Sequence, residues 1–311
     1  MGPISPFDPA SGQALAISNL FILTLAIGGI VFLLVTSLVV YASIRYRSRQ
    51  VGADPKQVFG NRRMEIAWTA APAGLLLVLF GFTLHAMAVS DPPVSPSESP
   101  DMVIVAHQWW WEVRYPQDGV VTANEVHLPV GRPIRLRLES ADVIHDFWVP
   151  ALGRKMDATP GHPVTYSISV DKPGIYLGTC AEFCGAQHAW MRIRVVAQSP
   201  ADFNRWLSQQ AAVPTPAKTE AATRGAQLFQ SLTCSSCHAI AGTPAQAHVG
   251  PDLTHLADRQ TLGAGVLDNT PDNLKRWLTN PQAYKPGSYM PNLHLSPDQV
   301  DALVAYLESL K

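Results

Sequence analysis

Two long apolar stretches set the first part of the chain apart from the rest. Residues 17–41 and 66–90 contain no Asp, Glu, Lys or Arg. A helix needs about 20 apolar residues to cross the roughly 30 Å hydrocarbon core of a bilayer. Buried helices of a soluble core are the alternative, but two uncharged runs of this length are not typical of them. The pattern therefore predicts a two-helix transmembrane anchor within residues 1–91.

The segment between the two stretches predicts the orientation of this anchor. Positive charges dominate it, and by the positive-inside rule we expect it to lie in the cytoplasm. Both termini, and everything after Asp91, would then lie outside, in the periplasm or beyond. We expect the first stretch to be an anchor, because it is too long for a signal peptide and no basic region precedes it. The charged residues are Arg45, Arg47, Arg49, Lys56, Arg62 and Arg63, with Asp54 and Glu65 opposing them.

After a Pro- and Ser-rich hinge at residues 91–100, the pattern becomes that of short strands separated by turns. Such runs indicate an all-β sandwich or barrel over residues 92–200. A short helix at Ala201–Gln209 and a Pro/Ala linker at residues 210–220 follow, together forming a connector at residues 201–220. The strands expected most strongly are Met102–Ala106, Ile134–Leu138, Val164–Val170 and Met191–Val196.

The remaining residues, 221–311, have a helical pattern. We expect helices at Ala222–Leu232, Pro271–Leu278 and Ser296–Leu310. Ser296 is the expected N-cap of the last helix, with Pro297 at its first position. The three parts together predict a multi-domain membrane protein with an all-β and an all-α domain. The net charge of −1 gives no indication of nucleic-acid binding.

The four cysteines form two local pairs, and we expect no structural disulfide. Cys180 and Cys184 are followed by His188 and Met191, and His145 ends a β-like run upstream. Soft thiolate and thioether donors with imidazoles suit copper in an electron-transfer site. A closed tetrahedral zinc site of two cysteines and two histidines is an alternative, but it leaves the methionine unexplained. Ordinary core packing of the methionine is another.

The second pair lies in Cys234-Ser-Ser-Cys237-His238, the C-x-x-C-H pattern of covalent haem c attachment. A thioredoxin-like redox motif is the rival, but no βαβ pattern surrounds these residues. Met290 is the only methionine after His238, and thioether ligation would raise the haem potential. The rival sixth ligands are His248, His255 and His294.

The first constellation resembles the binuclear CuA motif of cytochrome c oxidase subunit II, and the similarity extends from Ile17 to about Val196. The resemblance implies a cupredoxin-like β-barrel in which the sulfurs of Cys180 and Cys184 bridge two coppers. His145 and His188 would each bind one copper, with Met191 and the backbone carbonyl of Glu182 as weak outer ligands. In the family the carboxylate of that glutamate also touches a magnesium ion shared with the main subunit.

Two further residues take roles from this resemblance. Trp109, in the run Trp109-Trp110-Trp111, corresponds to the tryptophan at which electrons arrive, although packing is the alternative. In β geometry Trp109 and Trp111 share one face and Trp110 takes the other. Glu65 corresponds to the mouth of a proton pathway, and a carboxylate at a helix N-terminus is the equal alternative.

The C-terminal part is similar to a class I cytochrome c. In that family the Pro251 carbonyl orients the proximal histidine, and Trp277 and Tyr284 are candidate partners of the haem propionates. The whole pattern resembles the caa(3)-type haem–copper oxidases of bacterial cell membranes.

The resemblance implies an enzyme subunit of cytochrome c oxidase that passes electrons from cytochrome c or another donor through haem c and CuA. Oxygen would be reduced in oxidase subunit I. Two alternatives remain: a CuA-containing subunit of a nitric oxide reductase, and a membrane-tethered copper-binding protein without turnover. A quinol-oxidase subunit is disfavoured, because that relative lacks the copper ligands.

Overall fold

The computed structural model describes residues 4–47, 57, 59–94, 99–215 and 219–311. Arg49, Asp54 and Lys56 of the predicted cytoplasmic segment lie outside these residues, as do parts of the hinge and of the linker.

Two long helices carry the apolar stretches. They are α1 (Gly12–Arg45) and α2 (Arg62–Ser90), of 34 and 29 residues, and both are long and apolar enough to cross a membrane. Most of their large apolar side chains are exposed, as lipid-facing residues would be. The helix α2 begins at the N-cap Asn61, whose side chain accepts hydrogen bonds from the backbone N–H groups of Arg63 and Met64.

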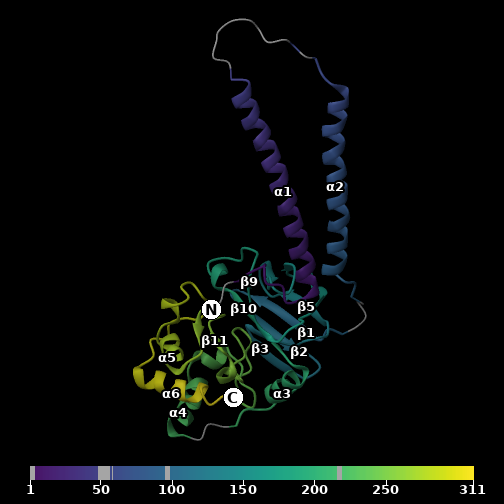
Figure 1. The fold of residues 1–311 in the computed structure, drawn as a ribbon. Helices are drawn as coiled ribbons and strands as arrows, with labels where there is room; N and C mark the ends of the chain where they lie inside the picture. The colour runs from purple at the N-terminus through teal and green to yellow at the C-terminus, as the bar shows by residue number, and fades with distance from the viewer. Residues whose placement is uncertain (1–3, 48–56, 58, 95–98, 216–218) are drawn as a thin grey trace. The chain divides into compact units, whose positions relative to one another are not determined.

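The β-rich region is a sandwich of two five-stranded sheets (Figure 1), as the strand pattern predicted. One sheet has the order β3-β2-β1-β5-β8 and the other β4-β10-β9-β6-β7. The bounds are β1 (Met102–His107), β2 (Trp110–Tyr115), β3 (Val120–Ala123), β4 (Glu125–Pro129), β5 (Ile134–Ser140), β6 (His145–Trp148), β7 (Met156–Ala158), β8 (Val164–Ile168), β9 (Gly174–Cys180) and β10 (Arg192–Gln198).

The core of the sandwich follows from alternation along its strands. In β5 the side chains of Ile134, Leu136 and Leu138 are buried, whereas those between them are partly exposed. All four predicted strands differ from the observed ones at their ends: β1 and β5 extend further than expected, β8 stops at Ile168 and β10 starts after Met191. That methionine is instead the last residue of the loop between β9 and β10.

The C-terminal region is mainly helical, as predicted. The predicted connector helix is α3 (Pro200–Gln210), which packs on the core of the β-sandwich. The helices of the C-terminal region are α4 (Glu220–Ser231), α5 (Pro271–Thr279) and α6 (Pro297–Leu307). Ser296 caps α6 in a capping box with Gln299, which confirms the predicted start, whereas the helix ends three residues before Leu310. Short elements complete it: η2 (Thr233–Ser236), η3 (Leu256–Asp258), η4 (Pro281–Ala283), and the hairpin of β11 (Thr261–Leu262) and β12 (Leu267–Asp268), which was not predicted. A further short helix, η1 (His188–Trp190), lies in the loop between β9 and β10 of the sandwich.

Helices α4 and α6 cross in close contact. A Cβ atom at Gly225 would lie 2.0 Å from the carbonyl oxygen of Ala302, so only glycine allows this approach. Beside the crossing, the rings of Phe229 and Tyr306 pack edge to face, 5.9 Å apart. The crossing forms one wall of the cavity described below.

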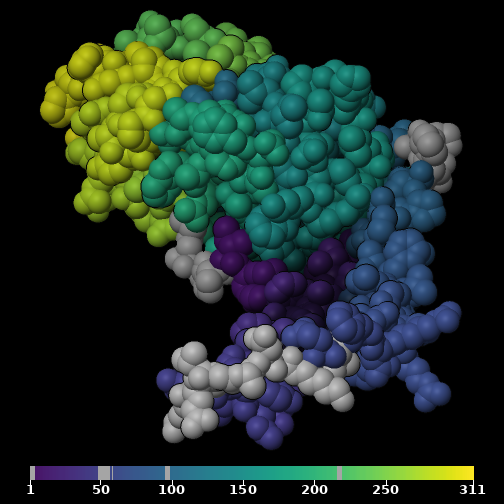
Figure 2. Space-filling model, turned by 90° about the horizontal axis from the view of Figure 1, so that it is seen from above, coloured from purple at the N-terminus to yellow at the C-terminus, as the bar shows by residue number. Residues whose placement is uncertain are grey.

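The C-terminal region packs directly against the β-sandwich (Figure 2). A buried carboxylate joins them: Glu125 Oε1 of β4 accepts hydrogen bonds from the backbone N–H groups of Gln260 and Thr261, at 2.8 and 2.9 Å. Trp110 of β2 packs with Ala264 of the β11–β12 turn. These contacts hold the second candidate site next to the first.

Candidate metal centres

Strand pairing brings the sulfur and imidazole donors together. His145 begins β6, and Cys180 ends β9, with which β6 pairs. Cys184, His188 and Met191 all lie in the loop that leads from β9 into β10, and β10 pairs back onto β9. The loop is therefore held at both ends by the same sheet, although His145 lies 35 residues before Cys180.

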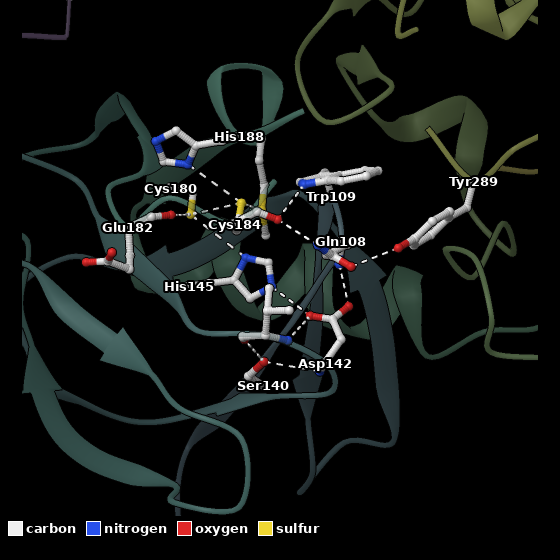
Figure 3. Close-up of polar contacts among 12 residues, drawn as sticks. Gln108, Trp109, Ser140, Asp142, His145, Cys180, Glu182, Cys184, His188 and Tyr289 are labelled. Atoms are coloured by element: carbon white, nitrogen blue, oxygen red, sulfur yellow. Dashed lines mark hydrogen bonds and ion pairs between the residues drawn. The ribbon is translucent and has the colours of Figure 1, made fainter. Parts of the chain in front are cut away.

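The donors form one compact cluster (Figure 3). The Sγ atoms of Cys180 and Cys184 are 3.7 Å apart, and the carbonyl oxygen of Glu182 lies 3.2 Å from Cys180 Sγ. Each imidazole faces one sulfur: His145 Nδ1 lies 3.9 Å from Cys180 Sγ, and His188 Nδ1 lies 3.6 Å from Cys184 Sγ. Met191 Sδ is 3.9 Å from Cys184 Sγ.

This donor set fits copper. Two thiols, two imidazoles, a thioether and a carbonyl converge, which is more than a closed tetrahedral zinc site uses. His145 and Met191 are fully buried, and Cys180 and Cys184 almost so. Met191 Sδ faces the sulfurs, so the packing and zinc alternatives account for the thioether less well than copper does.

The two thiols influence each other's ionisation. Their mutual hydrogen bond lowers the pKa of Cys180 and raises that of Cys184, and burial acts on both. The thiolate is the ligand form, so metal binding and proton release are coupled.

Asp142, which the sequence interpretation missed, orients His145. Its Oδ1 lies 2.8 Å from His145 Nε2, and its Oδ2 accepts a 2.6 Å hydrogen bond from the backbone N–H of Gln108. Burial opposes ionisation of Asp142, but these partners hold its pKa below the usual value. The carboxylate leaves Nδ1 free to act as a ligand, as outer partners of metal-bound histidines do. An acid three residues before a ligand histidine was the available signal.

The second candidate site is a cavity of about 420 Å³ in the C-terminal region. Cys234, Cys237, His238 and Met290 all line it. The Nδ1 of His238 lies 2.7 Å from the carbonyl oxygen of Pro251, which orients the ring. Burial lowers the pKa of His238, which favours the neutral imidazole that binds metals.

The lining of this cavity fits a haem. A Cβ atom at Gly250 would lie 2.5 Å from His238 Cε1, so glycine makes room for the histidine ring. Arg259 also lines the cavity, and its buried Nε has no hydrogen-bond partner among the residues that the structure describes, which suits a carboxylate-bearing ligand. Trp277 lines the cavity, whereas Tyr284 does not.

The rival sixth ligands lie elsewhere. Among the described residues that line the cavity, His248, His255 and His294 are absent. The Nε2 of His255 instead lies 3.0 Å from the carbonyl oxygen of Ala212. Met290 is thus the better placed candidate.

The three tryptophans face the sides that the alternation predicted, and two of them also line the cavity of the second site. Trp109 and Trp111 belong to the sandwich core, and Trp110 faces the other way. Trp109 Nε1 donates a 2.9 Å hydrogen bond to the carbonyl oxygen of Cys184. The two that line the cavity are Trp109 and Trp110.

The two glutamates for which the sequence suggested a role, Glu65 and Glu182, are both exposed. The carboxylate of Glu65 accepts a 3.1 Å hydrogen bond from the backbone N–H of Asn61, so it closes the cap of α2. That contact is what the helix-terminus alternative describes. Glu182 has an exposed side chain that points away from the sulfurs in Figure 3, while its carbonyl faces Cys180.

Comparisons with known proteins agree across the whole chain. Residues 5–86 match the family described as cytochrome c oxidase subunit II, transmembrane domain, and residues 118–198 match its periplasmic domain. Residues 222–311 match cytochrome c. The two membrane helices and the periplasmic domain therefore have the arrangement of this family.

Relatives that share this organisation carry the name cytochrome c oxidase subunit 2. The one from Alkalihalophilus pseudofirmus is 35% identical over 99% of this chain and 91% of the relative. Those from Bacillus sp. (strain PS3) and Bacillus subtilis are 34% and 32% identical over 86% and 87% of this chain, and over 80% and 82% of the relatives. These families imply copper in the β-sandwich and haem c in the C-terminal domain. The chain belongs to the cytochrome c oxidase subunit II family, and it is the membrane-bound subunit, with a fused cytochrome c domain, through which electrons reach a haem–copper oxidase.

Proposed function

We propose that this chain takes electrons from an external donor at a haem c and delivers them through a binuclear copper centre to the oxygen-reducing subunit. One observation carries the proposal. Trp109 lines the cavity that fits the haem, and its indole N–H donates to the carbonyl of Cys184, a residue of the copper cluster. Both sites therefore border on one side chain.

The copper site is assigned as follows. Cys180 and Cys184 would hold both copper ions, His145 and His188 would each bind one, and the remaining two ligands would complete the set. When bound, a copper pair accepts and releases one electron. The residues of this chain keep the donors in place, because both ends of the ligand loop are paired in one sheet and Asp142 orients His145. The remaining two ligands are Met191 and the carbonyl oxygen of Glu182.

The haem site is assigned in the same way. Cys234 and Cys237 would attach the porphyrin, and His238 and Met290 would bind its iron. The Pro251 carbonyl orients the proximal ring, at 2.7 Å from Nδ1. The Gln282 side chain donates a 2.7 Å hydrogen bond to the Met290 carbonyl, which holds the loop that presents the thioether.

Three further roles belong to the proposal. Trp109 is the residue through which electrons reach the copper site, supported by its hydrogen bond to the ligand loop. The carboxylate of Glu182 contacts a magnesium ion at the border with the main subunit, supported by its exposure. Glu65 marks the opening of a proton pathway, although its capping contact with Asn61 accounts for its position equally well.

The setting of the chain completes the proposal. Both termini and both cofactor domains lie on the periplasmic or extracellular side of a bacterial cell membrane, with the basic segment after Arg45 in the cytoplasm. The partners are oxidase subunit I, the other oxidase subunits, and cytochrome c or another reductant. We assign residues 1–91 to the anchor, 92–200 to the copper domain, 201–220 to the connector and 221–311 to the haem domain.

The test uses the complete oxidase purified through this chain. In the Cys184→Ser variant, the reductant should still reduce the haem, whereas oxygen consumption should stop and copper content should fall. Ser235→Ala, between the haem cysteines, is a control that should change neither. Oxygen consumption at the full rate by the Cys184→Ser complex would contradict the proposal.

A further inference from the structure

The loop that carries Met290 packs on the residue that borders the copper cluster. Tyr289 precedes Met290 in the chain, and its ring lies 5.1 Å from that of Trp109, at an interplanar angle of 34°. Trp109 is only 7% exposed, because the sandwich core and the haem domain enclose it. Tyr289 itself lines the haem cavity. One tyrosine therefore touches both the haem pocket and the tryptophan.

Two connections lead from Tyr289 to the same atom of the copper ligand loop (Figure 3). In the first, the Tyr289 ring packs on Trp109, whose Nε1 donates to the Cys184 carbonyl at 2.9 Å. In the second, the Tyr289 hydroxyl donates to Gln108 Oε1 at 2.8 Å, and Gln108 Nε2 donates to the same carbonyl at 2.7 Å. Both run through contacting atoms without a gap.

Other contacts set the position of this loop. The buried ammonium of Lys285 donates to the carbonyl oxygens of Trp109 and Gly263, at 2.8 and 2.9 Å. The side chain of Gln187, from the copper ligand loop, donates to the carbonyl of Pro286. The hydrogen bonds of Lys285 and Gln187 therefore hold the loop of Tyr289 against Trp109, and neither bond involves the Tyr289 ring.

The neighbouring tryptophan offers no comparable connection. Trp110 also lines the haem cavity, but its ring stacks on His107 at 4.3 Å and packs with Ala264. Among the contacts of the described residues, none joins the Trp110 ring to the loop of Cys184. A route through Trp110 would therefore have to cross the backbone to reach the copper ligands.

We propose that Tyr289 is the residue that couples the haem to Trp109 and, through the Cys184 carbonyl, to the copper centre. Tunnelling of an electron falls steeply with distance and is more efficient through bonded and contacting atoms than across gaps. In the step, one electron leaves the reduced iron and arrives at the oxidised copper pair. No bond forms or breaks, and the Tyr289 hydroxyl keeps its proton, which it continues to donate in the hydrogen bond to Gln108 Oε1. The inference rests on the proposed function.

The test measures the transfer itself, in the full chain with both cofactors bound within the oxidase. The haem is reduced rapidly by a photoactivated donor, and the absorbance of each centre is then followed. Tyr289→Leu removes both connections and should slow the transfer severalfold, because the electron must then cross a gap where the wild type has contacting atoms. Tyr289→Phe keeps the ring and should slow it about twofold. The reduction potentials of both centres should not change.

Two further variants separate coupling from docking. Tyr176→Phe removes the hydroxyl of a different tyrosine, which donates to the backbone carbonyl of Lys172, and should leave the transfer rate at the wild-type value. Lys285→Met should loosen the docked loop. Amide hydrogen exchange at residues 106–111 and 285–291, measured on the full chain with both cofactors bound, reports this directly. It should rise in Lys285→Met and stay unchanged in Tyr289→Leu.

Each outcome has one meaning. A wild-type transfer rate in Tyr289→Leu would overturn the coupling role, as would a slower rate accompanied by the increase in exchange seen for Lys285→Met. If the wild-type chain reduced its haem but never its copper, the proposed function would fail instead.

Discussion

The copper cluster and the haem cavity solve the problem of holding a redox group in opposite ways. The copper donors are packed inside the β-sandwich, with His145 and Met191 fully buried and the sulfurs 3.7 Å apart. The haem ligands instead surround about 420 Å³ of space. A metal ion adds little volume, so the protein core itself must hold the ligands. A porphyrin brings its own apolar bulk, so the domain around it is built with that bulk as part of its core.

Preventing haem attachment should give the largest effect. Replacing both Cys234 and Cys237 by alanine leaves the cavity without its porphyrin. At about 24 cal/mol per Å³, a cavity of this size costs at most about 10 kcal/mol, which approaches the whole stability of a typical domain, about 5–15 kcal/mol. We expect residues 221–311 of the variant to be digested rapidly by protease while the β-sandwich survives.

The control for this variant is replacement of Ser235 and Ser236, the residues between the two cysteines. If the haem domain without its cysteines resisted protease as well as the wild type does, the contrast between the two sites would be wrong.

Removing copper should have a smaller effect. A ligand present at about 100 times its Kd stabilises the folded state by about 2.7 kcal/mol, so chelation should lower stability by a few kcal/mol. The strands β9 and β10 should stay protected in amide hydrogen exchange, because their pairing and the buried core do not depend on the ion. Loss of that protection on chelation would show that copper, like haem, completes the fold.

Changing the partner of a copper ligand should have a moderate effect. Asp142→Asn keeps the shape but weakens the interaction with His145 Nε2. Loss of such a partner typically costs about 10- to 100-fold in metal affinity, which competition with a chelator measures. Glu139→Gln, a nearby change outside the cluster, should leave the affinity as it is. Equal affinities for the two variants would remove Asp142 from the site.

The smallest expected effect on stability comes from Glu125, at the contact between the β-sandwich and the C-terminal region. Burial raises the pKa of Glu125 above its ordinary value of 4.5, against the hydrogen bonds from Gln260 and Thr261. A carboxyl group whose pKa is raised by folding stabilises the folded state when the pH is below its unfolded-state pKa. This contribution is lost as the pH rises through the raised folded-state pKa. The contribution of Glu125 to wild-type stability should therefore decrease from pH 4.5 upward, by at most about 1.4 kcal/mol per pH unit.

Glu125→Gln tests this, because the amide oxygen keeps an acceptor without the charge. The free energy of unfolding, measured by denaturant at several pH values, should lose this slope in the variant. Glu220→Gln, at an exposed position in α4, should keep the slope. An unchanged slope in Glu125→Gln would assign the pH dependence to other groups.

The sequence predicted the parts of each site that depend on local chemistry. Cys180, Cys184, His188 and Met191 fall within twelve residues, so their donor types alone indicated copper. The apolar runs gave the membrane helices because length and composition suffice for that prediction. Asp142 escaped notice because an aspartate in a turn has many ordinary roles.

The contacts between the β-sandwich and the C-terminal region could not be predicted from local sequence patterns. Lys285 lies 176 residues from Trp109, and Tyr289 lies 181 residues from Gln108, yet each pair is hydrogen-bonded. A lysine and a tyrosine near a Met-Pro pair carry no signal of their partners. The alternation of strand residues also could not predict that Ala264 packs against Trp110.

The sequence by itself determined which donors the chain offers, in what order, and which segments suit a membrane, because ligand chemistry and hydrophobic length are local properties. Only the tertiary structure decided that His145 meets Cys180 and that Tyr289 lies on Trp109. The first depends on strand pairing and the second on domain docking, and both are set by contacts between residues far apart in the chain.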